Sequence, residues 1–212
     1  VLPARSPAQP YALFLFCGLL PWTWFATSLT ESAGVLISGG NLIKKVLFPA
    51  EILPIVSVLA NMVHFFFGFL VLVAFLVGFQ HLPDWRGLPW LPLVLAIQLV
   101  LTLGLALLLS AVTVHFRDVR DLVANFLTLG FWATPIVYPW TFDGLRDQAW
   151  FQWVLRLNPF AHLVIAYQEL LFFDGPDGHL PWLAVTGVVA LAVLLTGYWV
   201  FDRLRDSFAE VV

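Results

Sequence analysis

Charged residues are scarce in this chain of 212 amino acids, and their scarcity indicates which solvent surrounds it. Asp, Glu, Lys and Arg together make up 11% of the sequence, whereas hydrophobic residues make up 61%, including 20 Phe and 10 Trp. A soluble domain of this size has too little interior to bury so much apolar surface. We therefore expect an integral membrane protein.

Groups that bind nucleic acids, metals or cofactors are also few. A net charge of -3 offers no basic surface to nucleic acid. A single cysteine, Cys17, excludes a disulfide framework or a cysteine metal cluster, and the five histidines lack metal-ligand spacing. The only lysines, Lys44 and Lys45, follow "SGGNLI", which does not match a phosphate-binding loop. Asp174 and Asp177 resemble a turn rather than a catalytic pair. We expect no catalytic residues, no metal and no cofactor in this chain.

Long apolar runs are what the chain does contain. About 20 residues at 1.5 Å each cross the roughly 30 Å of hydrocarbon in a bilayer. Backbone groups in lipid must be satisfied internally, and the runs lack the two-residue alternation of a barrel, so the spans should be helical. The predicted fold is an all-α polytopic bundle with five spans, at residues 11–29, 52–79, 88–114, 122–138 and 182–201. Pro135 and Pro139 interrupt the end of the fourth of these.

Residues 148–173 form an apolar stretch of a different kind. Polar residues punctuate it, and Pro159 divides it into two parts too short to cross a bilayer. A re-entrant helical hairpin on the extracytoplasmic side explains this pattern, because such a hairpin is tolerated where it is buried in protein or lines a wet cavity. The alternative is an ordinary surface loop.

The distribution of Lys and Arg predicts orientation, because cytoplasmic loops carry an excess of both. Placing the C-terminus in the cytoplasm puts six of the ten inside and four outside. Five spans leave the two ends of the chain on opposite sides, which suggests that a first span is missing. The inside residues are Lys44, Lys45, Arg117, Arg120, Arg203 and Arg205; the outside residues are Arg5, Arg86, Arg146 and Arg156.

Two inner segments attract attention. In "HFRDVRD", residues 115–121 and here called the Arg-Asp segment, Asp118 can cap the next helix, Asp121 suits its first turn, and Arg117 can pair with Asp121. The acids are thus explained locally, but the arginines only as topology signals.

In "SGGNLIKKVLFPAEILP", residues 38–54 and here called the Lys-Lys segment, apolar residues recur at helical spacing. A short amphipathic helix there can lie on lipid or dock into a protein.

Aromatic and polar residues within the spans allow two interpretations each. Aromatic faces pack on sugar C–H faces, yet they also form the interfacial belt of membrane proteins. Asn61, His64 and Gln98 can face a functional interior or bond across helices. Glu31 and Glu169 each require water, a partner or protonation.

Five motifs in a fixed order resemble those of the permease subunit of ABC-2 type polysaccharide exporters, the group that exports O-antigen, capsular polysaccharide and teichoic acid. They are residues 10–54, "HFRDVRDL", "TPIVYP", "LNPFAHLVIAYQELLF" and the tail "FDRLRDSFAEVV". The resemblance covers the chain from near Pro10 to its end.

The resemblance implies a six-span subunit of the bacterial inner membrane that forms a homodimer around a channel. Two separate ATPase subunits would bind ATP and Mg, and the cargo would be a lipid-linked glycan. The chain would then be a single permease domain over residues 1–212, without its N-terminal interface helix and first span. By resemblance the ATPase-coupling residues are Asn41, Lys44, Lys45, Phe48, Pro49, Arg117, Asp118, Arg120 and Asp121. The expected channel-lining residues are Trp22, Trp24, Phe25, Trp132, Tyr138 and Trp140.

Two rival functions remain open from the sequence. One is an ABC-2 permease for a drug or another small lipophile, against which a wide aromatic pore would argue. The other is a membrane-embedded glycan-modifying enzyme, which would be active without any ATPase.

Overall fold

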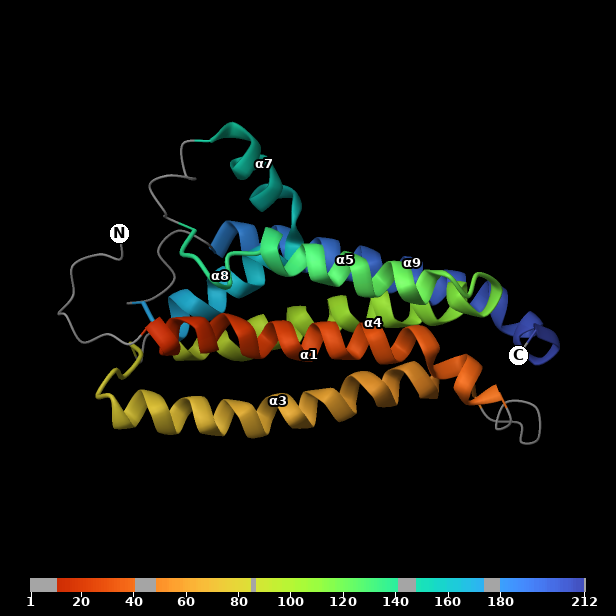
Figure 1. Cartoon of the computed structure of the whole chain (residues 1–212), viewed down its shortest axis with the longest axis horizontal. Helices are drawn as coiled ribbons and strands as arrows, with labels where there is room; N and C mark the ends of the chain where they lie inside the picture. Colours follow the sequence, from red (N-terminus) through yellow and green to blue (C-terminus); the bar gives the residue numbers. More distant parts are fainter. Residues whose placement is uncertain (1–10, 41–48, 85–86, 141–147, 174–179, 212) are drawn as a thin grey trace. The chain divides into compact units, whose positions relative to one another are not determined.

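The computed structural model describes residues 11–40, 49–84, 87–140, 148–173 and 180–211, and within these ranges it contains helices and no strand (Figure 1). The chain divides into two compact units. The first unit comprises Val1–Thr23, Phe65–Ala96 and Leu129–Gly187, and the second comprises Trp24–His64, Ile97–Thr128 and Val188–Val212. The helices are α1 (Tyr11–Ser38), α3 (Ile52–Gly78), the 3-10 helix η1 (Leu88–Trp90), α4 (Leu91–His115), α5 (Val119–Ala133), α7 (Ala149–Leu157), α8 (Pro159–Leu171) and α9 (Leu180–Val211).

Four helical stretches of the described chain are long and apolar enough to span a membrane. They are Tyr11–Ser38, Ile52–Gly78, Leu88–His115 and Pro181–Phe208. The predicted all-α polytopic class is therefore confirmed. Several of these helices extend beyond the predicted span boundaries, because polar residues continue the helix past its apolar part.

The expected span at residues 122–138 needs correction. Its helix, α5, covers only the 15 residues Val119–Ala133, about 22 Å at 1.5 Å per residue and thus short of a full span. The residues from Thr134 to Tyr138 form turns and bends. Pro135 disfavours helical geometry at Thr134, so the apolar run continues although the helix does not.

Two short helices form the predicted hairpin, α7 and α8, and the break falls at Asn158. The Asn158 Oδ1 accepts hydrogen bonds from the amides of Phe160 (3.0 Å) and Ala161 (3.3 Å), and its Nδ2 donates to Thr134 Oγ1 (3.1 Å). The residue thus caps α8 and ties it to the end of α5. All side chains from Phe160 to Leu171 are buried, so α8 forms part of the core of the first unit.

Helices α4 and α9 approach each other at two glycines in the second unit. A Cβ added at Gly104 would lie 2.6 Å from the backbone N and Cα of Leu194, and one added at Gly197 would collide with the carbonyl of Gly104. Glycine at both positions lets the two backbones meet directly, as small residues do in membrane helix packing.

Candidate coupling surface

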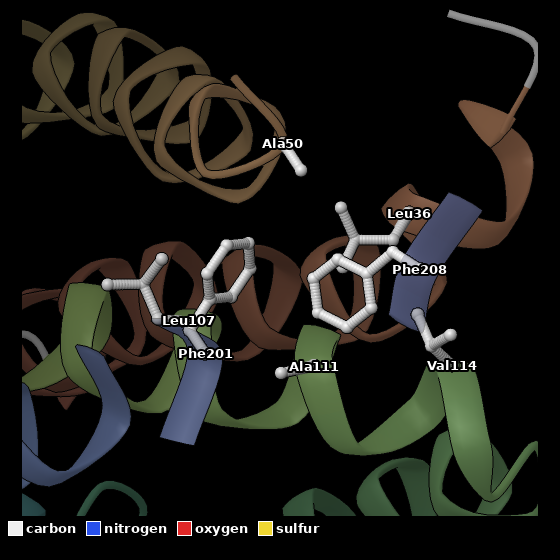
Figure 2. Packing of buried hydrophobic residues seen from close by; sticks show 7 residues of the cluster. All are labelled: Leu36, Ala50, Leu107, Ala111, Val114, Phe201 and Phe208. Carbon is white, nitrogen blue, oxygen red and sulfur yellow. The ribbon is translucent and has the colours of Figure 1, made fainter. Parts of the chain in front are cut away.

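One apolar cluster in the second unit joins the neighbourhoods of both inner segments. Ala50 lies within the Lys-Lys segment, and Val114 immediately precedes the Arg-Asp segment; both are buried in this cluster. Figure 2 shows its seven members, which come from α1, the residues before α3, α4 and α9: Leu36, Ala50, Leu107, Ala111, Val114, Phe201 and Phe208. The structure therefore brings the two segments to one core, although the sequence separates them widely.

The Arg-Asp segment is attached to α9. His115 Nε2 lies 3.0 Å from Ser207 Oγ, and the His115 ring lies 6.4 Å from that of Phe208. The four charged residues that follow, Arg117, Asp118, Arg120 and Asp121, are all exposed. His115, itself exposed, thus joins α9 to a run of exposed charged side chains.

The local roles predicted for the acids are only partly present. Asp118 directly precedes α5, and its carbonyl accepts hydrogen bonds from the amides of Asp121 (3.1 Å) and Leu122 (3.1 Å). Asp121 lies in the first turn as predicted. However, within the described ranges the Asp118 carboxylate makes no capping bond, and Arg117 forms no ion pair with Asp121. Capping therefore accounts for less of this segment than the sequence suggested.

Arg120 instead faces α1. A Cβ added at Gly34 would lie 3.6 Å from both Cζ and Nε of Arg120 and 3.7 Å from its Nη1. The guanidinium thus lies over a place on α1 that has no side chain. Sequence reasoning missed Gly34, whose only signal is a small residue in "ESAGVLIS".

Part of the Lys-Lys segment lies outside the described residues. Asn41, Lys44, Lys45 and Phe48 belong to that part, as does the predicted amphipathic helix. Pro49 is described and exposed, and its carbonyl accepts a hydrogen bond from the amide of Ile52 (3.1 Å) at the start of α3.

Three of the six expected channel residues are buried by the chain itself. Trp22 packs edge to face on Phe160 with 5.3 Å between ring centroids, and Trp24 Nε1 donates to the carbonyl of Val58 at 3.2 Å. Phe25 is also buried. These side chains pack the interior of their own units, and whether they line a channel stays a prediction.

The other three expected channel residues lie in the first unit and are more accessible. Trp132 is 63% exposed, and its carbonyl accepts a hydrogen bond from Tyr138 Oη at 2.9 Å. Tyr138 and Trp140 pack against the small core of α7 and α8, which contains Phe151 and Leu155. Of the six expected channel residues, Tyr138 and Trp140 are thus the two that pack on the hairpin.

Polar residues of the spans follow the bonding interpretation in one clear case. Asn61 is buried, and its Nδ2 donates to Glu31 Oε2 at 2.6 Å and to the carbonyl of Ser57 at 2.9 Å. Glu31 therefore has the partner that its position required. His64 is exposed, whereas Gln98 and Glu169 are buried.

Comparison with known families identifies the group to which this architecture belongs. Residues 4–172 match the family model described as "ABC-2 type transporter". The chain belongs to the ABC-2 type transporter family. The resemblance inferred from the five motifs is thereby confirmed.

Named relatives of this ABC-2 chain are bacterial. It is 34% identical over 209 residues to the O-antigen export system permease protein RfbA of Myxococcus xanthus, covering 98% of this chain and 78% of the relative. Two proteins of the same name from Klebsiella pneumoniae are 30% and 29% identical over 208 residues, with the same coverage. In this ABC-2 chain, Ala50 and Val114 are buried in one apolar cluster, so the Lys-Lys and Arg-Asp segments adjoin the same core.

Proposed function

We propose that this chain is the permease subunit of an ATP-binding-cassette exporter that moves a lipid-linked polysaccharide across the bacterial inner membrane. The ABC-2 family and the relatives named as O-antigen export permeases support the proposal. The polysaccharide is of the O-antigen, capsular or teichoic acid type. A second copy of the chain completes the channel, and two separate ATPase subunits bind ATP and Mg.

One observation carries the coupling part of the proposal. Ala50 and Val114 share the cluster of Figure 2, so the Lys-Lys and Arg-Asp segments extend from one packed core. A partner that pushes on either segment moves the ends of α1, α4 and α9 with it, because close-packed cores transmit displacement. The proposed contact residues for the ATPase are the nine expected from the sequence: Asn41, Lys44, Lys45, Phe48, Pro49, Arg117, Asp118, Arg120 and Asp121.

The orientation proposed here places both segments and the C-terminus in the cytoplasm. Arg203 and Arg205 of α9 belong to the second unit, as do Arg117 and Arg120. This distribution agrees with the bias of Lys and Arg toward cytoplasmic loops. The α7–α8 hairpin is then extracytoplasmic.

Exposed aromatic side chains suit a glycan track near the hairpin. Trp132, Trp150 and Trp153 are 63%, 59% and 61% exposed. Flat aromatic surfaces bind sugars through contacts that tolerate many sugar types, while Trp N–H groups can bond hydroxyls. The hairpin and the end of α5 are therefore the proposed place where the polymer leaves the channel.

Purification of the full-length protein in mild detergent tests the partnership. We expect an ATPase with a phosphate-binding loop to co-purify with it, together with a second copy of the chain. A preparation that keeps complexes intact and contains no such ATPase would overturn the exporter hypothesis. Glycan-modifying activity in the isolated chain would favour an enzyme instead.

Charge reversal tests the coupling surface. Arg117→Glu and Arg120→Glu lie on exposed positions, so both variants should insert and fold normally. They should lower ATP turnover of the reconstituted complex by roughly tenfold, since reversing a charge at an interface costs on the order of 1–2 kcal/mol. The reference variant is Arg203→Glu, which changes charge on α9 outside the two segments. If ATP turnover and export are unchanged in both variants, the Arg-Asp segment only begins helix α5 and has no role in coupling.

A further inference from the structure

Arg120 of the Arg-Asp segment contacts the spanning helix α1 at Gly34. The Cβ positions quoted above place the guanidinium within ordinary van der Waals distance of a missing side chain. A methyl group at position 34 would touch the guanidinium at ordinary contact distance, and a longer side chain would have to share the space beside it. Arg120 forms no ion pair within the described ranges, so this contact, rather than a carboxylate, defines its position.

The electrostatics of the α1 end favour a cation at this place. Gly34 lies four residues before Ser38, where α1 ends. The last carbonyl groups of a helix carry partial negative charge, which stabilises Lys or Arg nearby. Arg120 approaches this last part of α1 from α5, where the partial negative charge favours a cation.

Helix α1 is in turn attached to α3 within the same unit. Glu31, one turn before Gly34, accepts the 2.6 Å hydrogen bond from Asn61, and Trp24 donates to the Val58 carbonyl. A displacement of α1 at Gly34 therefore moves the neighbouring part of α3 as well.

We propose that Gly34 is a positioning residue whose bare backbone seats the Arg120 guanidinium, and that movement of the Arg-Asp segment reaches α1 through this seat. The inference rests on the proposed coupling role of the segment. It assigns a function to a residue outside the proposed ATPase-contact and glycan-binding residues. The space at Gly34 accommodates a methyl group at ordinary contact distance, and we expect a branched side chain to compete with the Arg120 guanidinium for it.

The test uses the full-length protein in complex with its ATPase in lipid nanodiscs. A fluorophore on Thr30→Cys, an exposed position of α1, reports movement when ATP and Mg are added. The native Cys17 is buried and should not react. Gly34→Leu should reduce the fluorescence response about fivefold, the scale on which mutations along a coupled network act. Gly34→Ala should reduce it less.

Gly78→Leu is the matched control. It adds the same side chain to another glycine that ends α3, where nothing lies within 4 Å of the added Cβ. Its response should equal that of the native chain. Two results would overturn the proposed role of Gly34. One is a fluorescence response in Gly34→Leu as large as that of the native chain. The other is no response in the native chain while its ATPase is bound.

The double variant Gly34→Leu with Arg120→Ala protects the test against misfolding. Removing the guanidinium makes room for the added leucine side chain, so the double variant should melt at a higher temperature than Gly34→Leu alone. Its fluorescence response should be no smaller than that of Arg120→Ala, because two changes to one contact are not additive. Fully additive losses would contradict the inference. Loss of ATPase binding in the native chain would instead refute the proposed function.

Discussion

At the scale of single residues, the sequence indicated which polar groups need a hydrogen-bond partner. It was less successful at predicting which residue that partner is. Glu31 was expected to need water, a partner or protonation, and Asn61 donates a hydrogen bond to it at 2.6 Å. Pro159 was expected to divide the hairpin, and the residue before it, Asn158, caps α8 with its own side chain. In contrast, the seat of Arg120 at Gly34 was not predictable, because the two residues are distant in sequence and only packing brings them together.

The Glu31–Asn61 bond allows a direct measurement. Asn61→Ala removes the buried donor of a half-buried interhelical hydrogen bond. We expect the free energy of unfolding in detergent to fall by about 0.6–2 kcal/mol. His64→Ala is the control, since His64 lies one turn further along α3 and is exposed. Its effect should stay within about 0.5 kcal/mol. Equal losses in the two variants would show that the Asn61 bond contributes nothing specific.

At the scale of helices, hydropathy located the spanning elements but not their ends. Apolar runs predicted α1, α3, α4 and α9, because the bilayer requires about 20 such residues in each. Hydropathy failed at α5, where Pro135 ends the helix within a continuous apolar run. Hydropathy also underestimated the length of α9, whose polar C-terminal part remains helical to Val211. Hydrophobicity reports the surrounding lipid, whereas helix ends depend on local backbone geometry.

The crossing of α4 and α9 gives a prediction at the same scale. Gly197→Leu forces apart two backbones that now touch, so we expect a loss of about 1–3 kcal/mol in the free energy of unfolding. Gly78→Leu again provides the control because its added side chain meets open space. Denaturation in mixed micelles, followed by circular dichroism, measures both. A Gly197→Leu variant as stable as the control would indicate that the helices separate at no cost.

At the scale of the whole molecule, composition alone predicted a polytopic helical membrane protein, and the structure and the family confirm it. The aromatic residues behaved less predictably. Composition gave no means of separating Trp24, which packs inside the chain, from Trp132, which is exposed. Both lie in apolar surroundings, and only tertiary packing distinguishes them.

Orientation in the membrane is open to chemical labelling. Because Cys17 is buried, single cysteines placed elsewhere report their own side of the membrane. Trp153→Cys should react with an impermeant maleimide in intact spheroplasts, whereas Asp118→Cys and Asp206→Cys should react only after permeabilisation. All three parent residues are exposed in the described chain. The reverse pattern would invert the proposed topology and remove the ATPase from the Arg-Asp segment.

The direct contact between Gly104 and the backbone of α9 also has a genetic consequence. In most cores, an enlarged side chain can be compensated by a smaller neighbour, but here each glycine meets backbone atoms that no substitution can shrink. Suppressors of a harmful change at Gly197 should therefore arise away from Gly104, at positions that alter how the two helices tilt. A substitution at this helix crossing therefore cannot be compensated by a second substitution at the contacting residue.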